Sequence, residues 1–541
     1  MSDFIQALRQ HRPDPDGRRW LYVPYDQLSD EIGPLAREPA RELGLVLIEN
    51  PGKAARRPYH RQKLANILAN QRHFALEQAR RGVAVRYLVA QDSYAQALES
   101  VSELGPLRVM EPAERELRQE LAPLFSSGLL EQIPHEGWLT TADQFKKSQK
   151  SGGFKMDAFY RKVRQDTGIL MRDGSPIGEK YSHDADNRES WAGEPAAPEP
   201  PTYELDDIKR EVGRLIEAHF SHHPGRLDLK RLPATKDEAA FLWEWAKKHC
   251  MKNFGPYEDA MSWRSRGVFH TRVSPLLNIH RLLPRTLVDD ALQLDIPLSS
   301  MEGFIRQVIG WREYVRHVHR ETDGFRTLDG KATRRGDGGY ALWAGQDWPG
   351  QPPEEQAEPN FFGADNPLPP AYWGKPSGLA CLDQVVDDVW YEGWSHHITR
   401  LMILSNLATL LDISPRQLTD WFWVAYIDAF DWVVEPNVLG MGTYAVGELM
   451  TTKPYISGAA YINRMSDYCD KCSFNPKKNC PITRLYWAFL GRHAERLEGN
   501  FRLAMPLRSL AKRSAANKAK DAETFEWVID TLTGGGRLEP S

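Results

Sequence analysis

Four of the five cysteines in this 541-residue chain lie in its last third, and their spacing limits what that part can fold into. Cys469 and Cys472 form a CxxC pair, and Cys480 follows after seven residues and precedes a proline. A fourth, Cys381, lies upstream. Such thiols bind metals, and a Cys-Pro ligand is more typical of an iron–sulfur cluster than of a zinc ribbon, which needs two close pairs. A zinc site and a set of reduced, buried thiols remain alternatives.

The amino-acid composition and length of the chain limit the kind of protein that it can be. The chain is 41% hydrophobic and 26% charged, with a net charge of −4, and its length predicts two to four domains. Its N-terminus lacks the apolar run of a signal peptide, and no window approaches the ~18 apolar residues of a membrane span. An odd number of cysteines argues against a disulfide framework. We expect a cytoplasmic protein without membrane contact, and a local basic patch could still bind nucleic acid.

The first part of the chain alternates between strand and helix patterns. Residues 45–48 and 83–89 are short apolar runs bounded by turn residues, whereas residues 61–80 carry apolar side chains at helical spacing. This alternation predicts a parallel, Rossmann-like α/β domain over residues 1–135. No GxGxxG motif follows a strand, so a dinucleotide site of that kind is not supported.

The remaining segments are predicted from composition. Residues 136–206 form a connection that ends in the Pro-rich stretch 189–204, which cannot form a regular element. Residues 207–505 are predicted to form an all-helical domain, interrupted by an insertion at 322–371 and by the cysteine hairpin at 466–482. Residues 506–541 form a C-terminal tail.

Two basic segments are candidates for DNA contact. One combines cations and aromatic side chains: Lys155, Phe159, Tyr160, Arg161, Lys162 and Arg164. The other contains Arg508, Lys512, Arg513, Lys518 and Lys520. For both segments the alternative is an ordinary solvated helix face. This alternative is favoured for the C-terminal run.

Several motifs carry a resemblance to a known family. Residues 269–275, 303–314 and 394–400, with 453–455 and 465–469, resemble the flavin-binding half of photolyases and cryptochromes. Together with the cysteines they are similar to the iron–sulfur bacterial branch, the prokaryotic (6-4) photolyases. Residues 25–28 and 58–63 match more loosely, with Tyr25 where the branch has Gly. The resemblance implies the photolyase/cryptochrome fold, an α/β domain followed by a large all-α FAD-binding domain.

The resemblance also implies residues that hold FAD. Hydroxyls and helix-start amides at Thr271, Val273 and Ser274 would meet the phosphates, although those residues alone equally suggest a helix cap. Glu435 would lie near the flavin ring, where burial should raise its pKa; a solvated acid is the alternative. The full implied set is Tyr257, His270, Thr271, Val273, Ser274, Trp311, Arg312, Asp428, Asp431 and Glu435.

Catalytic, electron-transfer and antenna residues follow from the same resemblance. His397 would donate a proton to the lesion, assisted by His396, Tyr455 and Gln307, while Leu401 stands where eukaryotic relatives have another histidine. Electrons would reach the flavin through Trp421, Trp373 and Tyr461. Asp26, Gln27 and Glu49 would bind a 6,7-dimethyl-8-ribityllumazine antenna. Acids within 183–188 could bind Mg²⁺. The implied [4Fe–4S] ligands are Cys381, Cys469, Cys472 and Cys480, with Cys250 excluded.

These expectations converge on one function. The predicted activity is light-dependent repair of (6-4) pyrimidine–pyrimidone photoproducts in UV-damaged DNA by a monomer that uses electron transfer from reduced FAD. A blue-light-sensing cryptochrome would keep the flavin without repairing DNA. A primase-like iron–sulfur DNA-binding domain would lack flavin altogether.

Overall fold

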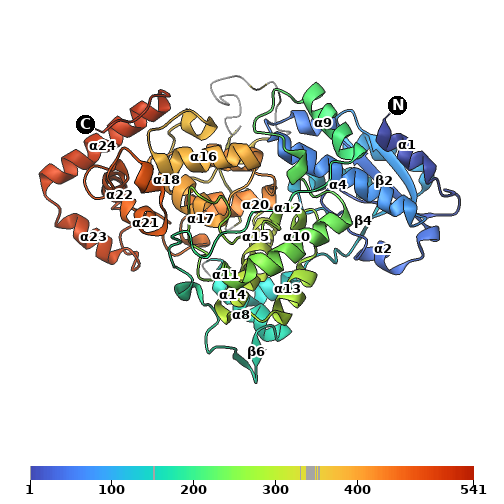
Figure 1. Cartoon of the computed structure of the whole chain (residues 1–541), viewed down its shortest axis with the longest axis horizontal. Helices are drawn as coiled ribbons and strands as arrows, with labels where there is room; N and C mark the ends of the chain where they lie inside the picture. Colours follow the sequence, from blue (N-terminus) through green and yellow to red (C-terminus); the bar gives the residue numbers. More distant parts are fainter. Residues whose placement is uncertain are drawn as a thin grey trace.

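The N-terminal part of the chain forms one five-stranded sheet in which every pairing is parallel (Figure 1). The computed structural model describes residues 2–149, 153–328, 330–336, 348, 350 and 354–540. The strands lie in the order β3-β2-β1-β4-β5. Their bounds are β1 Arg19–Tyr22, β2 Leu43–Glu49, β3 Ala84–Val89, β4 Leu107–Met110 and β5 Leu130–Ile133. The predicted α/β fold is confirmed.

Helix α4, Arg61–Arg80, is the central support of this domain and has the bounds that the sequence predicted. It packs between the sheet and α9, Asp207–His219. Because β2 is covered on both faces, all seven of its residues are buried, as in other parallel sheets. The remaining helices of this part are α1 Asp3–Gln10, α2 Gly33–Arg37, α3 Pro51–Ala55, α5 Tyr94–Glu99 and α6 Arg115–Ser126.

The connection between the domains is mostly irregular. It contains α7 Ala142–Ser148, α8 Met156–Thr167 and the short hairpin of β6 Met171–Arg172 and β7 Ser175–Pro176. Residues 189–204 form neither helix nor strand, as predicted, and α9 begins at Asp207 behind its cap Asp206. The predicted insertion at 322–371 falls partly outside the described residues. Its described part holds the short strands β8 Thr327–Leu328, β9 Lys331–Ala332, β10 Arg335–Gly336 and β11 Gln356–Ala357.

The rest of the chain is helical, and its C-terminal helices lie at the end of the molecule opposite the sheet (Figure 1). The helices before the insertion are α10 Lys236–His249, α11 Met251–Phe254, α12 Ser274–Leu277, α13 Pro284–Gln293, α14 Leu298–Ile305 and α15 Glu313–Glu321. Those after it are α16 Ala380–Glu392, α17 His397–Thr399, α18 Asn406–Leu410, α19 Pro415–Ala425, α20 Asp431–Val434, α21 Ala459–Met465, α22 Pro481–Arg492, α23 Ala504–Ala511 and α24 Ala515–Thr533. None of the described helices has the length and apolarity needed to cross a bilayer.

Three π-helical segments interrupt these helices at Arg306–Arg312, Arg400–Ser405 and Glu435–Gly442. Such wide turns are rare and are often found at functional sites. Two of these segments contain predicted site residues, and the segment Arg400–Ser405 begins three residues after His397. The wide turns therefore single out the same region of the helical domain as the sequence motifs.

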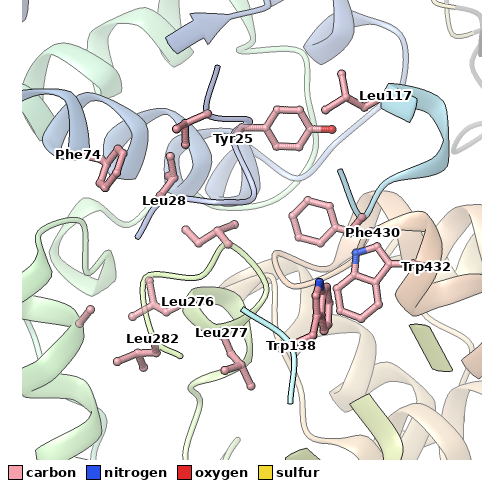
Figure 2. Close-up of a cluster of buried hydrophobic side chains, with 14 of the residues drawn as sticks. Tyr25, Leu28, Phe74, Leu117, Trp138, Leu276, Leu277, Leu282, Phe430 and Trp432 are labelled. Atoms are coloured by element: carbon pink, nitrogen blue, oxygen red, sulfur yellow. The ribbon is translucent and has the colours of Figure 1, made fainter. Parts of the chain in front are cut away.

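One hydrophobic core continues across the junction between the two domains. Tyr25 lies over Phe430 with ring centroids 6.5 Å apart, and Trp138 meets Trp432 edge to face at 5.2 Å (Figure 2). The backbone N–H of Arg115 donates to Asp431 at 2.6 Å. The segment predicted to hold the flavin is thus fixed against the sheet domain.

Candidate active site and cofactor pockets

Three histidines from two distant segments form a cluster in the helical domain. His270 and His396 stack with ring centroids 4.4 Å apart, and His397 approaches His270 at 5.3 Å. Burial lowers the pKa of His270 and of His396 well below the usual value, and the nearby His397 lowers both further. The stacked pair is therefore neutral at pH 7, and His397 is the partly exposed member of the cluster.

Beside the histidines, a polar network joins four elements. Ser274 donates its hydroxyl to Asp428 at 2.7 Å, and Arg400 donates to both carboxylate oxygens of Asp428. Asn278 links this network to Arg312 by accepting from its Nε at 3.0 Å and by donating to the Asp428 carbonyl. Ser274 makes no cap hydrogen bond to α12, so the alternative of a side-chain helix cap is wrong.

The turn before α12 has a strained backbone at Arg272, and ring nitrogens in this turn and in the neighbouring His396 lack hydrogen-bond partners in the described part of the chain. Arg272 has a φ of 58°, a left-handed conformation that is costly for a residue with a side chain. Within the described residues, His270 Nε2 and His396 Nδ1 are buried without a hydrogen-bond partner. Buried polar groups normally have partners, so these atoms mark a place where a ligand could bind. Thr271 and Val273 are buried in the same turn.

A group of carboxylates lies next to His397. Glu258 accepts from Gln307 at 2.8 Å and from Asn187 at 2.9 Å, while Tyr461 donates to Asp259 at 3.3 Å. Burial raises the pKa of Asp259, an effect that His397 opposes. The structure thus brings Gln307 and Tyr461 from distant helices into the surroundings of the predicted proton donor.

Tyr455 is half-buried, and its pKa is raised by burial and by Asp184 and Asp157. Asp184 pairs with Arg188, and Asp186 pairs with His183 and Lys180. No group of three or more His, Cys, Asp or Glu side chains in the described part of the chain could hold a single metal ion. Magnesium at these acids stays a prediction.

The expectation for the pKa of Glu435 is wrong. Burial alone would raise it, but Arg326, His319 and Arg416 together lower the pKa to about 2. Glu435 is fully buried and accepts from Arg416 and His319, each at 3.0 Å. It is a charged acceptor, not a protonated acid or a solvated one.

Asp431 differs from Glu435 because its partners are backbone groups. Its carboxylate accepts from the N–H groups of Arg115 and Trp432, both at 2.6 Å, and burial raises its pKa to about 6. Both oxygens therefore already have a donor in this structure, and the predicted contact of Asp431 with a flavin stays a prediction.

Two predicted cofactor residues lie apart from the histidine network. Trp311 meets Tyr314 edge to face at 6.1 Å. The Tyr257 ring packs against Phe269, and its hydroxyl donates to the Glu194 carbonyl at 3.4 Å in the linker. Neither has a contact with the network around Asp428 among the described residues.

The tryptophans form a chain that the sequence did not reveal. Trp421 is buried and meets Trp390 edge to face at 6.0 Å, and Trp390 stacks on the half-buried Trp373 at 5.4 Å. Indole N–H groups of Trp421 and Trp390 both donate to the Tyr372 carbonyl at 2.9 Å. The sequence did not single out Trp390, because no local feature distinguishes it from the rest of the 17 tryptophans. Its place in the chain of indole rings depends on a contact between α16 and α19.

The four cysteines of the last third line one cavity with an empty volume of about 300 Å³. Cys381 is in the first turn of α16, and Cys480 is the residue before α22. Burial raises the pKa of Cys381, and the other three thiols raise it further, so all four thiols lie near one another. Cys250 is outside this group and donates to the His270 carbonyl.

A second, larger cavity lies between the sheet, α4 and α9 and has an empty volume of about 810 Å³, including its mouth. Glu49, Tyr25, Lys53, Lys63 and Phe430 are among its lining residues. Glu49 lines the cavity and already accepts from Arg72 at 2.6 Å, and its predicted contact with an antenna stays a prediction.

Asp26 and Gln27 do not line this cavity. Gln27 donates to the Met110 carbonyl at 3.0 Å. Neither carboxylate oxygen of Asp26 has a partner in the described residues, and burial with the nearby Glu114 raises its pKa to about 7. Asp26 is fully buried outside this cavity, and its predicted contact with an antenna stays a prediction.

The predicted DNA-facing segment at 155–164 is largely wrong. Phe159, Tyr160 and Arg164 are buried, and Arg164 donates to the Leu170 carbonyl at 2.6 Å as part of the core. Lys162 pairs with Asp166. Amphipathic spacing placed one face of α8 inward, which composition alone could not show.

Comparison with known proteins establishes the family. A protein named (6-4) photolyase from Agrobacterium fabrum is 32% identical to this chain over 512 residues, which cover 90% of this chain and 94% of that protein. The chain belongs to the photolyase and cryptochrome family. The family model described as deoxyribodipyrimidine photo-lyase-related protein matches residues 21–232.

Two solved structures show that the family fold is shared. A class III photolyase from Agrobacterium tumefaciens has a TM-score of 0.50 at 14% identity, with 95% of this chain and 98% of that chain covered. A cryptochrome from Synechocystis has the same score and identity, with 94% and 98% covered. Membership in the family implies a flavin cofactor, and the unsatisfied ring nitrogens of His270 and His396 fit its polar groups.

Proposed function

We propose that the protein repairs (6-4) photoproducts in UV-damaged DNA under light, and that His397 donates a proton to the lesion. The name of the Agrobacterium fabrum relative supports the substrate. The observation that carries the role of His397 is its place as the partly exposed ring beside two buried, neutral histidines. Bound FAD, once reduced, supplies the electron in this chemistry.

The surrounding residues have distinct roles in this proposal. The stacked His270 and His396 rings hold the floor of the site, while Ser274 and Asp428 fix the turn that would meet the cofactor. Glu258 orients Gln307, whose amide can then hydrogen-bond the edge of a base extruded from the helix. Tyr455 would contact the same base. Trp421, Trp390 and Trp373 would carry electrons from the surface.

We also propose that Cys381, Cys469, Cys472 and Cys480 hold a [4Fe–4S] cluster. The four thiols come from three separate segments of the chain and line one cavity. Proline follows Cys480, and a Cys-Pro ligand is more typical of a cluster than of a zinc ion. Four cysteines are the usual ligand set of such clusters.

The larger cavity is the site that we propose for a lumazine antenna. Its volume and its aromatic wall suit a flat heterocycle, and Glu49 offers a hydrogen-bond acceptor. Repair of chromosomal DNA would place the protein, as a monomer, in the cytoplasm.

The central test is repair of a defined (6-4) oligonucleotide by reduced, illuminated protein. His397→Ala should keep FAD bound but lower the repair rate at least about 100-fold, the size expected for loss of a general acid. His219→Ala, an exposed histidine on α9, is the matched control and should repair normally.

The outcomes separate the candidate functions. Normal repair by His397→Ala would remove His397 as proton donor. A wild-type protein that binds the lesion and is photoreduced but never restores the bases would favour a blue-light-sensing cryptochrome. Absence of flavin would contradict both.

A further inference from the structure

The most exposed large apolar side chains in the described part of the chain lie at the turn that leads into α23. Phe501 and Met505 are each 72% exposed; Phe501 is in that turn, and Met505 is the second residue of the helix. Single exposed apolar residues are common on protein surfaces. Two exposed apolar side chains next to each other indicate a binding surface when the groups around them also suit a ligand.

Three cationic side chains lie beside the two apolar ones. The Arg502 guanidinium lies 5.1 Å from the centroid of the Phe501 ring, and Arg508 donates its Nε to the Ala504 carbonyl at 3.2 Å. Lys512 is exposed one turn further. Within the described residues these three cations form no salt bridge, whereas the neighbouring Arg513 pairs with Asp521. Free cations beside apolar groups are typical of nucleic-acid contacts.

The position of this surface relates it to the candidate active site. Asn500 is buried and donates to the Thr452 carbonyl at 2.8 Å, which fixes the residue before Phe501 against the segment that leads to Tyr455. Asn500 also donates to Glu448, whose carbonyl accepts from Lys155 at 2.7 Å. The surface is therefore anchored to the flank of the proposed lesion pocket. Helix α23 packs against α22, which in turn packs against α21.

We propose that Phe501, Arg502, Met505, Arg508 and Lys512, here named the α23 ridge, bind the DNA duplex next to the damaged bases. The cations would contact phosphates, and Phe501 and Met505 would pack on sugars and on base edges that the extruded lesion leaves unstacked. DNA is favoured over a protein partner because Asn500 fixes this surface beside the segment that leads to Tyr455, which the proposed function places at the lesion. The inference rests on the proposed function for its substrate.

Binding measurements over a range of salt concentrations test this directly. The titrations use a duplex of about two helical turns that carries one (6-4) lesion and, separately, a lesion-bearing single strand of about six nucleotides, which lacks the flanking duplex that the ridge would bind. Replacing Arg502 and Arg508 together by Ala should reduce the slope of log affinity against log salt by about 2 for the duplex. Phe501→Ala should weaken duplex binding on the order of tenfold.

Control variants test whether the loss of duplex affinity is specific to the ridge. Lys248→Ala and Phe241→Ala, both on α10, remove an exposed cation and an exposed aromatic ring elsewhere, and both should bind as the wild type does. Unchanged duplex binding by the ridge variants would overturn the proposal, as would loss of a dimer in sedimentation without loss of DNA affinity.

Repair of the short lesion strand at saturating concentration reports on the proposed function separately. If ridge variants lose duplex affinity but repair the short strand normally, both proposals stand. If the wild type binds the duplex through the ridge but repairs nothing, only the proposed function fails.

Discussion

Glu435 is a fully buried carboxylate in contact with two arginines, Arg326 and Arg416, and with His319, and its charge is part of what holds the site together. Arg416 also pairs with Asp420, so the cluster continues across α19. A buried ion pair that loses one partner leaves an uncompensated charge, which is strongly destabilising. The position of Glu435 therefore matters for stability before any cofactor is considered.

We predict that Glu435→Gln lowers the free energy of unfolding by about 3–5 kcal/mol at pH 7. Because the folded-state pKa is lowered from 4.5 to about 2, the stabilisation from the charged form is complete above about pH 4.5 and is lost as the pH falls toward 2. Urea midpoints at several pH values measure this. A deficit of the same size at pH 2 and pH 7 would contradict the assignment.

At the scale of elements, α16, the cysteine hairpin and the start of α22 each contribute cysteine to the thiol cavity. We predict that protein purified without oxygen contains about four iron and four sulfide per chain, because four cysteines bind one [4Fe–4S] cluster. Cys480→Ser should lose most of the iron, and Cys250→Ser should keep it. Metal analysis that finds zinc in place of iron would refute the cluster.

The tryptophan chain links α19 and α16 to the 3₁₀ turn Pro370–Trp373. We predict that Trp390→Phe slows photoreduction of the flavin about as much as Trp421→Phe does, because phenylalanine keeps the packing but is a far poorer electron donor than indole. Transient absorption after a light pulse measures the rate. Trp487→Phe, on α22, is the control; equal rates in Trp390→Phe and the wild type would remove Trp390 from the route.

The elements themselves were largely predictable, whereas their mutual contacts were not. Apolar runs and helical spacing predicted β2, β3 and α4, because periodicity is a local property. The lowered pKa of Glu435 and the bridging role of Trp390 depend on side chains far apart in the sequence. No local pattern encodes such contacts.

At the scale of the whole molecule, the junction between the two domains is built from long-range backbone and side-chain contacts. Lys63 on α4 donates to the carbonyl groups of Trp423 and Ala429, which lie 360 and 366 positions later in the chain. His60 and Leu28 make further backbone contacts to the helical domain. The segment that carries Asp428 and Asp431 is therefore held in place by the first domain.

This separation determines when the site can form during synthesis. A ribosome adds about 5–20 residues per second, so roughly 20 to 70 seconds pass between the appearance of Lys63 and that of Ala429. During that interval the Lys63 amine has neither of its carbonyl acceptors, and the junction face of the sheet domain stays in contact with water. The nascent chain thus carries a folded sheet with an open face, and cofactor binding must wait until translation is about four-fifths complete.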